Sequence, residues 1–217
     1  MKHSFLTMLF GVLAVISCEA QTPTNGETLS HYLFNDFRKG KVLLKSGTVT
    51  EEELNYNALT SEMVYNDHGK YLAIANFRDV DTVTIEGRQF IPGMKGFYEV
   101  LTHTQFPLYE EYSSVIKDPG AGIGYGMSSN TSAATPLKSL IQSGGAYNLK
   151  LPDGYETASQ HVFYIWKDAR FRPVGSARQL TGLFPDKKAW INDWVKEKKS
   201  DFTKREDVVA IVTGMMN

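Results

Sequence analysis

The sequence predicts an α+β fold: an antiparallel β-meander, arranged as a sandwich, roll or partial barrel, followed by a C-terminal helical segment. Two observations carry this prediction. From about residue 40 to residue 166, short β-favouring runs are separated by turn signals roughly every 8–12 residues, as in antiparallel sheets. From Ser176 onward, the apolar residues recur with the 3.6-residue period of amphipathic helices.

The composition is that of a globular protein. Of the 217 residues, 42% are hydrophobic and 22% are charged, which excludes a wholly disordered or collagen-like chain. The formal net charge of −1 gives no overall attraction to nucleic acid. A single cysteine excludes an intramolecular disulfide and a zinc site built on several thiolates. We therefore expect no cofactor and no nucleic-acid partner.

Residues 1–20 are predicted to be a signal peptide. Lys2 and His3 supply a short positive region, and the segment from Phe5 to Ile16 contains a single polar residue. This apolar segment is shorter than the roughly 20 residues that cross a bilayer as a helix, but it suits the core of a signal peptide. We therefore expect the mature protein outside the cytoplasm: periplasmic, associated with the outer membrane, or secreted.

Two cleavage sites are compatible with this signal. The segment Val15-Ile16-Ser17-Cys18 resembles a bacterial lipobox, in which cleavage before Cys18 leaves a thiol that carries lipid. The segment Cys18-Glu19-Ala20 resembles an ordinary signal-peptidase site with small residues at positions −3 and −1. The only cysteine of the chain falls where lipid attachment requires it, so we favour the lipoprotein. Contact with a membrane is then expected only through this anchor.

A flexible leader at 21–31, rich in Thr, Pro, Asn, Gly and Glu, precedes a β-rich domain at 32–172. The domain contains alternating or continuous runs of β-favouring residues, bounded by turn residues such as Ser46-Gly47 and Asn66-Asp67-His68-Gly69. Strands are expected at 41–45, 48–57, 63–65, 71–75, 80–85, 89–91, 97–101, 109–116, 147–151 and 161–166. Both faces of the last run are apolar or aromatic, which favours a central, well-buried strand.

Residues 118–145 interrupt this rhythm and are predicted to form a Gly/Ser-rich loop. The segment 120–126 spells GAGIGYG and superficially resembles a phosphate-binding loop. A dinucleotide site needs a strand before such a loop and a helix after it, whereas here Asp118-Pro119 precedes and a Ser/Thr run follows. We therefore interpret the segment as surface loop.

The helical segment at 173–217 is expected to pack on the β-rich domain. Three helix caps are predicted: Ser176 with Gln179, Thr203 with Glu206, and Asp186. Apolar stripes are predicted for the residues that repeat at helical spacing: Trp190, Ile191, Trp194 and Val195 in one helix, and Val208, Val209, Ile211, Val212 and Met215 in the next.

No catalytic motif is apparent. The histidines of the mature chain are widely scattered and form no HExxH motif: His31, His68, His103 and His161. Two acidic pairs, Asp79 with Asp81 and Glu110 with Glu111, are interpreted as solvated surface. Glu110 and Glu111, as sequence neighbours in a strand, are expected to point in opposite directions.

Three segments carry a resemblance to a known family: Leu54-Asn55-Tyr56-Asn57 after a hairpin at Gly47, Leu151-Pro152-Asp153-Gly154-Tyr155-Glu156, and the capped helices from Ser176. Together they resemble a family of uncharacterised exported proteins of Bacteroidota-type bacteria, from about Tyr32 to the C-terminus. The resemblance implies bacterial export and one shared fold. It brings no activity and no catalytic residue.

Two functional hypotheses follow. The first is an exported cell-envelope protein that is not an enzyme and binds an envelope protein or a small ligand through aromatic residues, with Tyr125, Tyr164 and Trp166 as the candidate surface. The alternative is an envelope hydrolase whose site is assembled only in three dimensions, with His103 or His161 beside a carboxylate.

Overall fold

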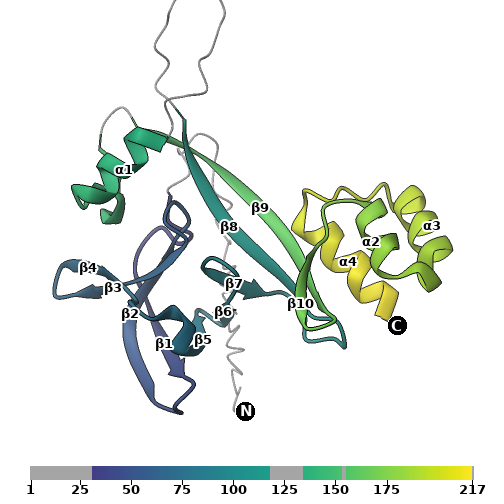
Figure 1. Ribbon diagram of the computed structural model, residues 1–217, viewed down its shortest axis with the longest axis horizontal. Coiled ribbons are helices and arrows are strands. Elements are labelled where there is room, and N and C mark those ends of the chain that lie inside the picture. The colour runs from purple at the N-terminus through teal and green to yellow at the C-terminus, as the bar shows by residue number, and fades with distance from the viewer. Residues whose placement is uncertain (1–30, 118–133, 153–154, 217) are drawn as a thin grey trace, which may run out of the picture.

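The computed structural model describes residues 31–117, 134–152 and 155–216, and its main element is one ten-stranded antiparallel sheet (Figure 1). The strand order is β10-β9-β8-β7-β6-β5-β1-β2-β3-β4, and the sheet does not close into a barrel. The predicted α+β class is confirmed. The strands are β1 (Arg38–Leu44), β2 (Val49–Asn57), β3 (Glu62–Asp67), β4 (Lys70–Ala73), β5 (Val80–Ile85), β6 (Arg88–Pro92), β7 (Phe97–Val100), β8 (Leu108–Lys117), β9 (Glu156–Lys167) and β10 (Arg170–Pro173).

Successive hairpins build the sheet, with one exception. Strands β1 to β4 pair in sequence order, then β5 returns to the free side of β1, where Val83 lies opposite Val42. Strands β5 to β10 then pair in sequence order. Gly47, Gly69 and Gly87 adopt positive φ in the hairpin turns, a conformation that glycine tolerates best.

Two sequence predictions in the middle of the chain are wrong. Residues 134–142, expected in the Gly/Ser-rich loop, form helix α1 (Ala134–Gln142). Residues 147–151, expected to form a strand, contain the end of the 3₁₀ turn η2 (Gly145–Tyr147) and no strand residue. Contacts distant in sequence explain both differences, because Leu140 and Ala146 pack with Leu59 and Ile116 in one apolar cluster. Residues 118–133, which include the GAGIGYG segment, lie outside the described part of the chain.

Helices α2 (Ala177–Leu183), α3 (Lys188–Lys198) and α4 (Arg205–Met216) follow β10 and lie beside the β9–β10 end of the sheet (Figure 1). The predicted apolar stripe of α4 is confirmed, since Val208, Ile211, Val212 and Met215 are buried. The stripe of α3 is confirmed in part: Ile191 is buried and Trp194 and Val195 are half-buried, but Trp190 is exposed. The buried side chains form one apolar cluster with Leu108, Phe163 and Ile165 of the sheet.

One of the three predicted caps forms as expected. The Ser176 hydroxyl accepts a hydrogen bond from the Gln179 amide nitrogen at 3.3 Å. Asp186 instead lies inside the 3₁₀ turn η3 (Pro185–Lys187), and α3 has no side-chain cap. The Thr203 hydroxyl donates to Asp201 at 2.7 Å and does not cap α4.

The two faces of the sheet differ from β7 to β10. On one side, which we call the helix face, Leu108, Glu110 and Tyr112 of β8 lie beside Phe163 and Ile165 of β9. On the other side, which we call the aromatic face, the residues are Tyr98, Tyr109, Glu111, Val162, Tyr164, Trp166 and Phe171. Because strand side chains alternate in direction, each strand contributes to both faces.

Candidate functional site

The aromatic face is built on packed rings from four strands. Tyr98 of β7 and Tyr164 of β9 stack with ring centroids 5.0 Å apart and planes 4° from parallel. Phe171 of β10 meets Tyr98 edge-on at 4.9 Å and Tyr109 of β8 at 5.3 Å. Edge-to-face and offset-stacked contacts of this kind add stability beyond the area they bury. The result is a packed aromatic layer.

Trp166 lies at the outer edge of this layer. Its ring meets Phe171 at 4.8 Å, yet 40% of the residue remains exposed. Val162, on the same face of β9, is also exposed, while Tyr164 between them is buried. Among the described residues, no helix residue belongs to the aromatic cluster, in which Tyr98, Tyr109 and Tyr164 are buried.

Glu111 places a charge within the aromatic face. Its carboxylate accepts a hydrogen bond from the Tyr164 hydroxyl at 2.9 Å, and the residue is half-buried. Burial, followed by this bond and the carboxylate charge, raises the pKa of Tyr164 above its ordinary value. Burial and the charge of Glu111 also raise the pKa of Tyr98. In the described part of the chain, no cation pairs with Glu111.

A glycine makes room for the ring of Tyr98. A Cβ atom on Gly93 would lie 2.6 Å from that ring, so the ring packs directly over the backbone of the β6–β7 turn. The Gly93 amide donates to the Gly96 carbonyl at 2.7 Å and closes this turn. The turn therefore fixes the base on which Tyr164 stacks.

Two of the three residues predicted to form a binding surface lie in the described part of the chain. Tyr164 and Trp166 do belong to one aromatic cluster, but only Trp166 is exposed, and Tyr125 lies outside the described residues. The run expected to be a central, buried strand is the second strand from the sheet edge. The sequence did not indicate that Glu111 and Phe171 belong to the aromatic face, because the pairing register of the strands decides which residues share a face.

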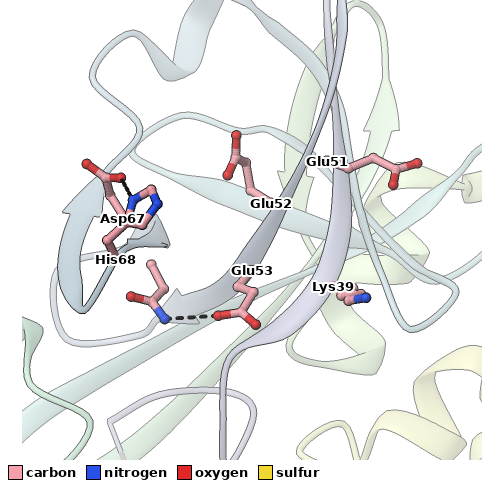
Figure 2. A pocket seen from close by; sticks show the side chains of 7 residues that line it. Lys39, Glu51, Glu52, Glu53, Asp67 and His68 are labelled. Carbon is pink, nitrogen blue, oxygen red and sulfur yellow. Dashed lines mark hydrogen bonds and ion pairs between the residues drawn. The ribbon is translucent and has the colours of Figure 1, made fainter.

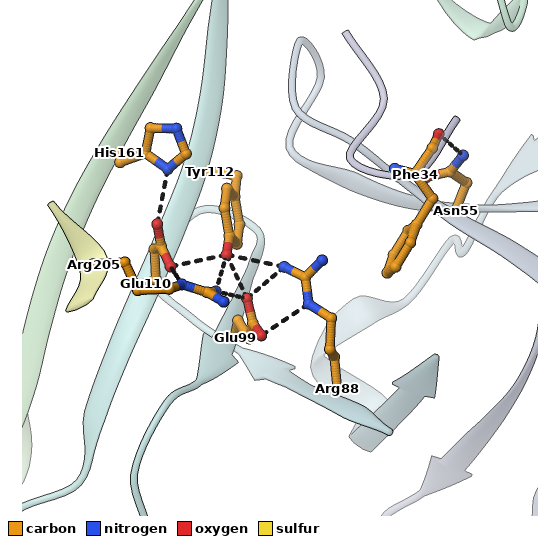
Figure 3. Close-up of polar contacts among 8 residues, drawn as sticks. All are labelled: Phe34, Asn55, Arg88, Glu99, Glu110, Tyr112, His161 and Arg205. Carbon is orange, nitrogen blue, oxygen red and sulfur yellow. Dashed lines mark hydrogen bonds and ion pairs between the residues drawn. The ribbon is translucent and has the colours of Figure 1, made fainter. Parts of the chain in front are cut away.

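A second polar feature lies on the helix face (Figure 3). Glu99 of β7 and Glu110 and Tyr112 of β8 converge with Arg88 of β6 and with Arg205, the first residue of α4. Arg88 donates to the two oxygens of Glu99 at 2.9 and 2.6 Å. Arg205 donates to Glu110 at 2.6 Å and also contacts Glu99 and Tyr112. We call these five residues the charge network.

The charge network is internally balanced. Two arginines offset two glutamates whose side chains are only 5% and 2% exposed. Burial acts to raise the pKa of Glu110, but the hydrogen bond from His161 and the charge of Arg205 outweigh it and hold this pKa below its ordinary value. Burial and the nearby carboxylates raise the pKa of Tyr112, so the phenol stays protonated. Such buried charges persist because each one is paired.

The expectation that Glu110 is solvated is therefore wrong, although Glu110 and Glu111 do point to opposite faces. Neighbouring charges supplied by other strands and by α4 make the burial possible. Asp79 and Asp81 are exposed, as expected.

His161 borders the charge network. Its Nδ1 atom lies 2.8 Å from Glu110, and its other ring nitrogen points away from the network (Figure 3). The side chain is 43% exposed. A histidine held by a carboxylate in this way resembles a general base. Among the described residues, however, no serine, threonine or cysteine side chain is hydrogen-bonded to it, so no nucleophile completes the arrangement.

The other histidines lie elsewhere. His103 is exposed in the loop between β7 and β8. His68 is exposed in the β3–β4 turn and bonded to Asp67 at 2.7 Å. His31 is buried, and its Nε2 atom lies 3.0 Å from the Ala146 carbonyl.

An acidic pocket of about 470 Å³ lies at the other end of the sheet (Figure 2). It is lined by charged and polar side chains of β1, β2, β3 and the β3–β4 turn: Lys39, Glu51, Glu52, Glu53, Asn66, Asp67 and His68. Glu51 pairs with Lys41 at 3.1 Å, and Glu53 accepts from Asn66 at 2.9 Å. Across the described ranges, no group of three or more His, Cys, Asp or Glu residues is placed to hold a metal ion.

Within the described residues, no helix has the length and apolar character needed to cross a membrane.

The comparisons with known proteins identify no relative. Neither the family models, nor the curated proteins, nor the solved structures include a match to this chain.

Proposed function

We propose that the protein is an exported, non-enzymatic component of a bacterial cell envelope, and that it binds a partner protein or small ligand through its aromatic face. The observation that carries this proposal is Trp166, an indole 40% exposed on a base of packed aromatic rings. Binding surfaces are enriched in tryptophan and tyrosine, which bury a large area at low entropic cost.

The rigidity of the base supports a binding role. Phe171 holds one side of Trp166, and the Tyr98–Tyr164 stack holds Phe171. A side chain already held by its neighbours loses little freedom when a ligand covers it, so more of the interaction energy becomes affinity.

Site-specific photo-crosslinking tests this role. A benzoylphenylalanine at position 166, in the full chain expressed in its native envelope, is expected to form discrete adducts on illumination. Position 190 is the matched control, because Trp190 is similarly exposed at 36% but lies on α3. Adducts that form equally at both positions, or at neither, would contradict the proposal.

The proposed export depends on the first 20 residues, and the lipobox predicts a lipid on Cys18. Expression of the full chain in a bacterium with lipoprotein processing is expected to give a mature protein that begins at Cys18, with diacylglyceryl and acyl additions visible in its intact mass. Cys18→Ala is expected to remove these additions and the membrane association. A mature chain that begins at Gln21 without lipid would show ordinary secretion instead.

A hydrolase is the second candidate, and the 2.8 Å contact of His161 with Glu110 favours it. A general base contributes about 10²–10⁴-fold to a rate. If the protein hydrolyses ester or glycoside substrates, His161→Gln should lower that rate by at least a hundredfold while His103→Gln leaves it unchanged. Equal rates in both variants would remove His161 from the reaction.

A further inference from the structure

The aromatic face presents a charge and an exposed ring at a defined spacing. Glu111 lies opposite Val162 in the β8–β9 pair, and Trp166 follows on the same side of β9. Trp166 is four positions after Val162, which corresponds to roughly 13 Å along an extended strand. The buried ring of Tyr164 lies between the two points.

Glu111 is the acidic residue of this face, and it has no cationic partner among the described residues. It is half-buried and receives a hydrogen bond from Tyr164. Glu110, its neighbour on the opposite face, receives Arg205 and His161.

This arrangement is complementary to a positive charge followed by an apolar group. An ammonium or guanidinium can make a charge-assisted hydrogen bond to Glu111, which is stronger than a bond between neutral groups. The exposed Trp166 ring and the exposed Val162 side chain beside it offer apolar area for a large side chain. A peptide strand has the same rise per residue as β9, so side chains four residues apart match both points.

We propose that the aromatic face binds an extended basic segment of a partner protein, with a lysine or arginine at Glu111 and a large apolar side chain, about four residues away, against Trp166. The inference rests on the proposed binding function and specifies the partner's chemistry.

Four labelled peptides test the inference by fluorescence anisotropy with the mature chain. The probes are acetyl-TKSTSLT-amide, its reversed-order form acetyl-TLSTSKT-amide, and the same two peptides with glutamine in place of lysine. In whichever of the two sequence orders binds more tightly, the lysine peptide is expected to bind about tenfold more tightly than its glutamine counterpart. This difference converts to about 1.4 kcal/mol. Higher salt is expected to reduce this ratio, because it screens the ion pair.

Three variants assign the contacts. Glu111→Gln is expected to abolish the preference for lysine, and Trp166→Ala to weaken both peptides. Glu197→Gln is the control, since Glu197 is an exposed acid on α3 that pairs with Lys198 at 3.0 Å. Near-ultraviolet circular dichroism checks the fold of each variant. The salt dependence of the unmodified protein tests the ion pair without a variant.

The outcomes separate the inference from the proposed function. Equal binding of lysine and glutamine peptides, lost in Trp166→Ala, overturns the cationic partner and leaves binding at the aromatic face standing. Failure of all four peptides also overturns the inference, while crosslinking at position 166 decides the proposed function independently. Self-association in sedimentation that Trp166→Ala abolishes would assign the face to a second copy of the chain, which overturns the inference as well.

Discussion

Two buried asparagines explain why the segment Leu54-Asn55-Tyr56-Asn57 has its polar residues. The Asn55 side chain bonds to the Phe34 nitrogen at 3.1 Å and the Phe34 oxygen at 2.8 Å. The Asn57 side chain donates to the Ala146 carbonyl at 2.7 Å and accepts from the Leu59 amide. Each asparagine side chain forms hydrogen bonds with backbone groups that no neighbouring strand pairs. These two residues are therefore structural.

His31 gives a pH-dependent contribution to stability. It is buried against the Ala146 carbonyl, and burial lowers its pKa from the ordinary 6.5, against the effect of that hydrogen bond. The unfolded chain therefore binds a proton more readily than the folded one. This stabilisation is complete above pH 6.5 and is lost as the pH falls toward the lowered pKa of the folded state.

The measurement is urea unfolding at pH 7.5 and pH 5.5. We expect the free energy of unfolding to be lower at pH 5.5 than at pH 7.5. The contribution of His31 to this decrease is up to about 1.4 kcal/mol for each pH unit below 6.5. In His31→Gln, whose side chain does not titrate, this part of the slope disappears. An identical slope in the variant would show that His31 is not the group responsible.

At the scale of elements, replacing a glycine by alanine is expected to lower stability at one position and to raise it at another, because the surroundings of the two glycines differ. A Cβ atom on Gly96 would lie 2.2 Å from the Ser61 carbonyl oxygen, so Gly96→Ala forces the β6–β7 turn away from the β2–β3 connection. Overpacking of this kind costs about 1–3 kcal/mol.

A Cβ atom on Gly182 in α2 meets nothing within 4 Å, so Gly182→Ala is expected to stabilise the protein by about 0.5–1 kcal/mol through helix propensity. Thermal unfolding of the two variants measures the change in stability at each position. A stabilised Gly96→Ala would contradict the close contact between Gly96 and Ser61.

Prediction of elements succeeded where local patterns determine the structure. The hairpin turns at Gly47, Gly69 and Gly87 and the apolar stripe of α4 follow from residues close in sequence. Helix α1 was missed because its nine residues follow a polar run and its burial depends on Ile116 and Leu59. The candidate site was partly missed for the same reason: Tyr98, Glu111 and Trp166 come together only through the pairing of β7, β8 and β9.

At the scale of the molecule, the charge network connects the sheet with the C-terminal helices. Tyr112 packs in the apolar cluster of the first strands, while Arg205 begins a helix that packs on Leu108 and Phe163. Arg205 reaches residues 95 and 106 positions earlier in the chain. It therefore joins two parts of the protein whose apolar clusters are distinct.

Arg205→Met is expected to lower the free energy of unfolding by about 2–3 kcal/mol, because it leaves two buried carboxylates without this cation. Hydrogen exchange of the amides in α2, α3 and α4 should accelerate more than exchange in β1 and β5. Adding Glu110→Gln to the variant should recover part of the loss. Lys198→Met, a control at an exposed position of α3, should change stability by no more than about 0.5 kcal/mol. Uniform acceleration over the whole sheet would show that Arg205 does not act at this junction.

The open sheet also has a consequence for solubility. It ends in β4 and β10, each only four residues long, and either edge could in principle pair with another copy and start a polymer. Lys70 begins one edge strand, and Arg170, Arg172 and Pro173 occupy most of the other. Repulsion between like charges and the missing amide of proline disfavour edge-to-edge growth. Both ends of the open sheet thus carry features that oppose the growth of fibres through added strands.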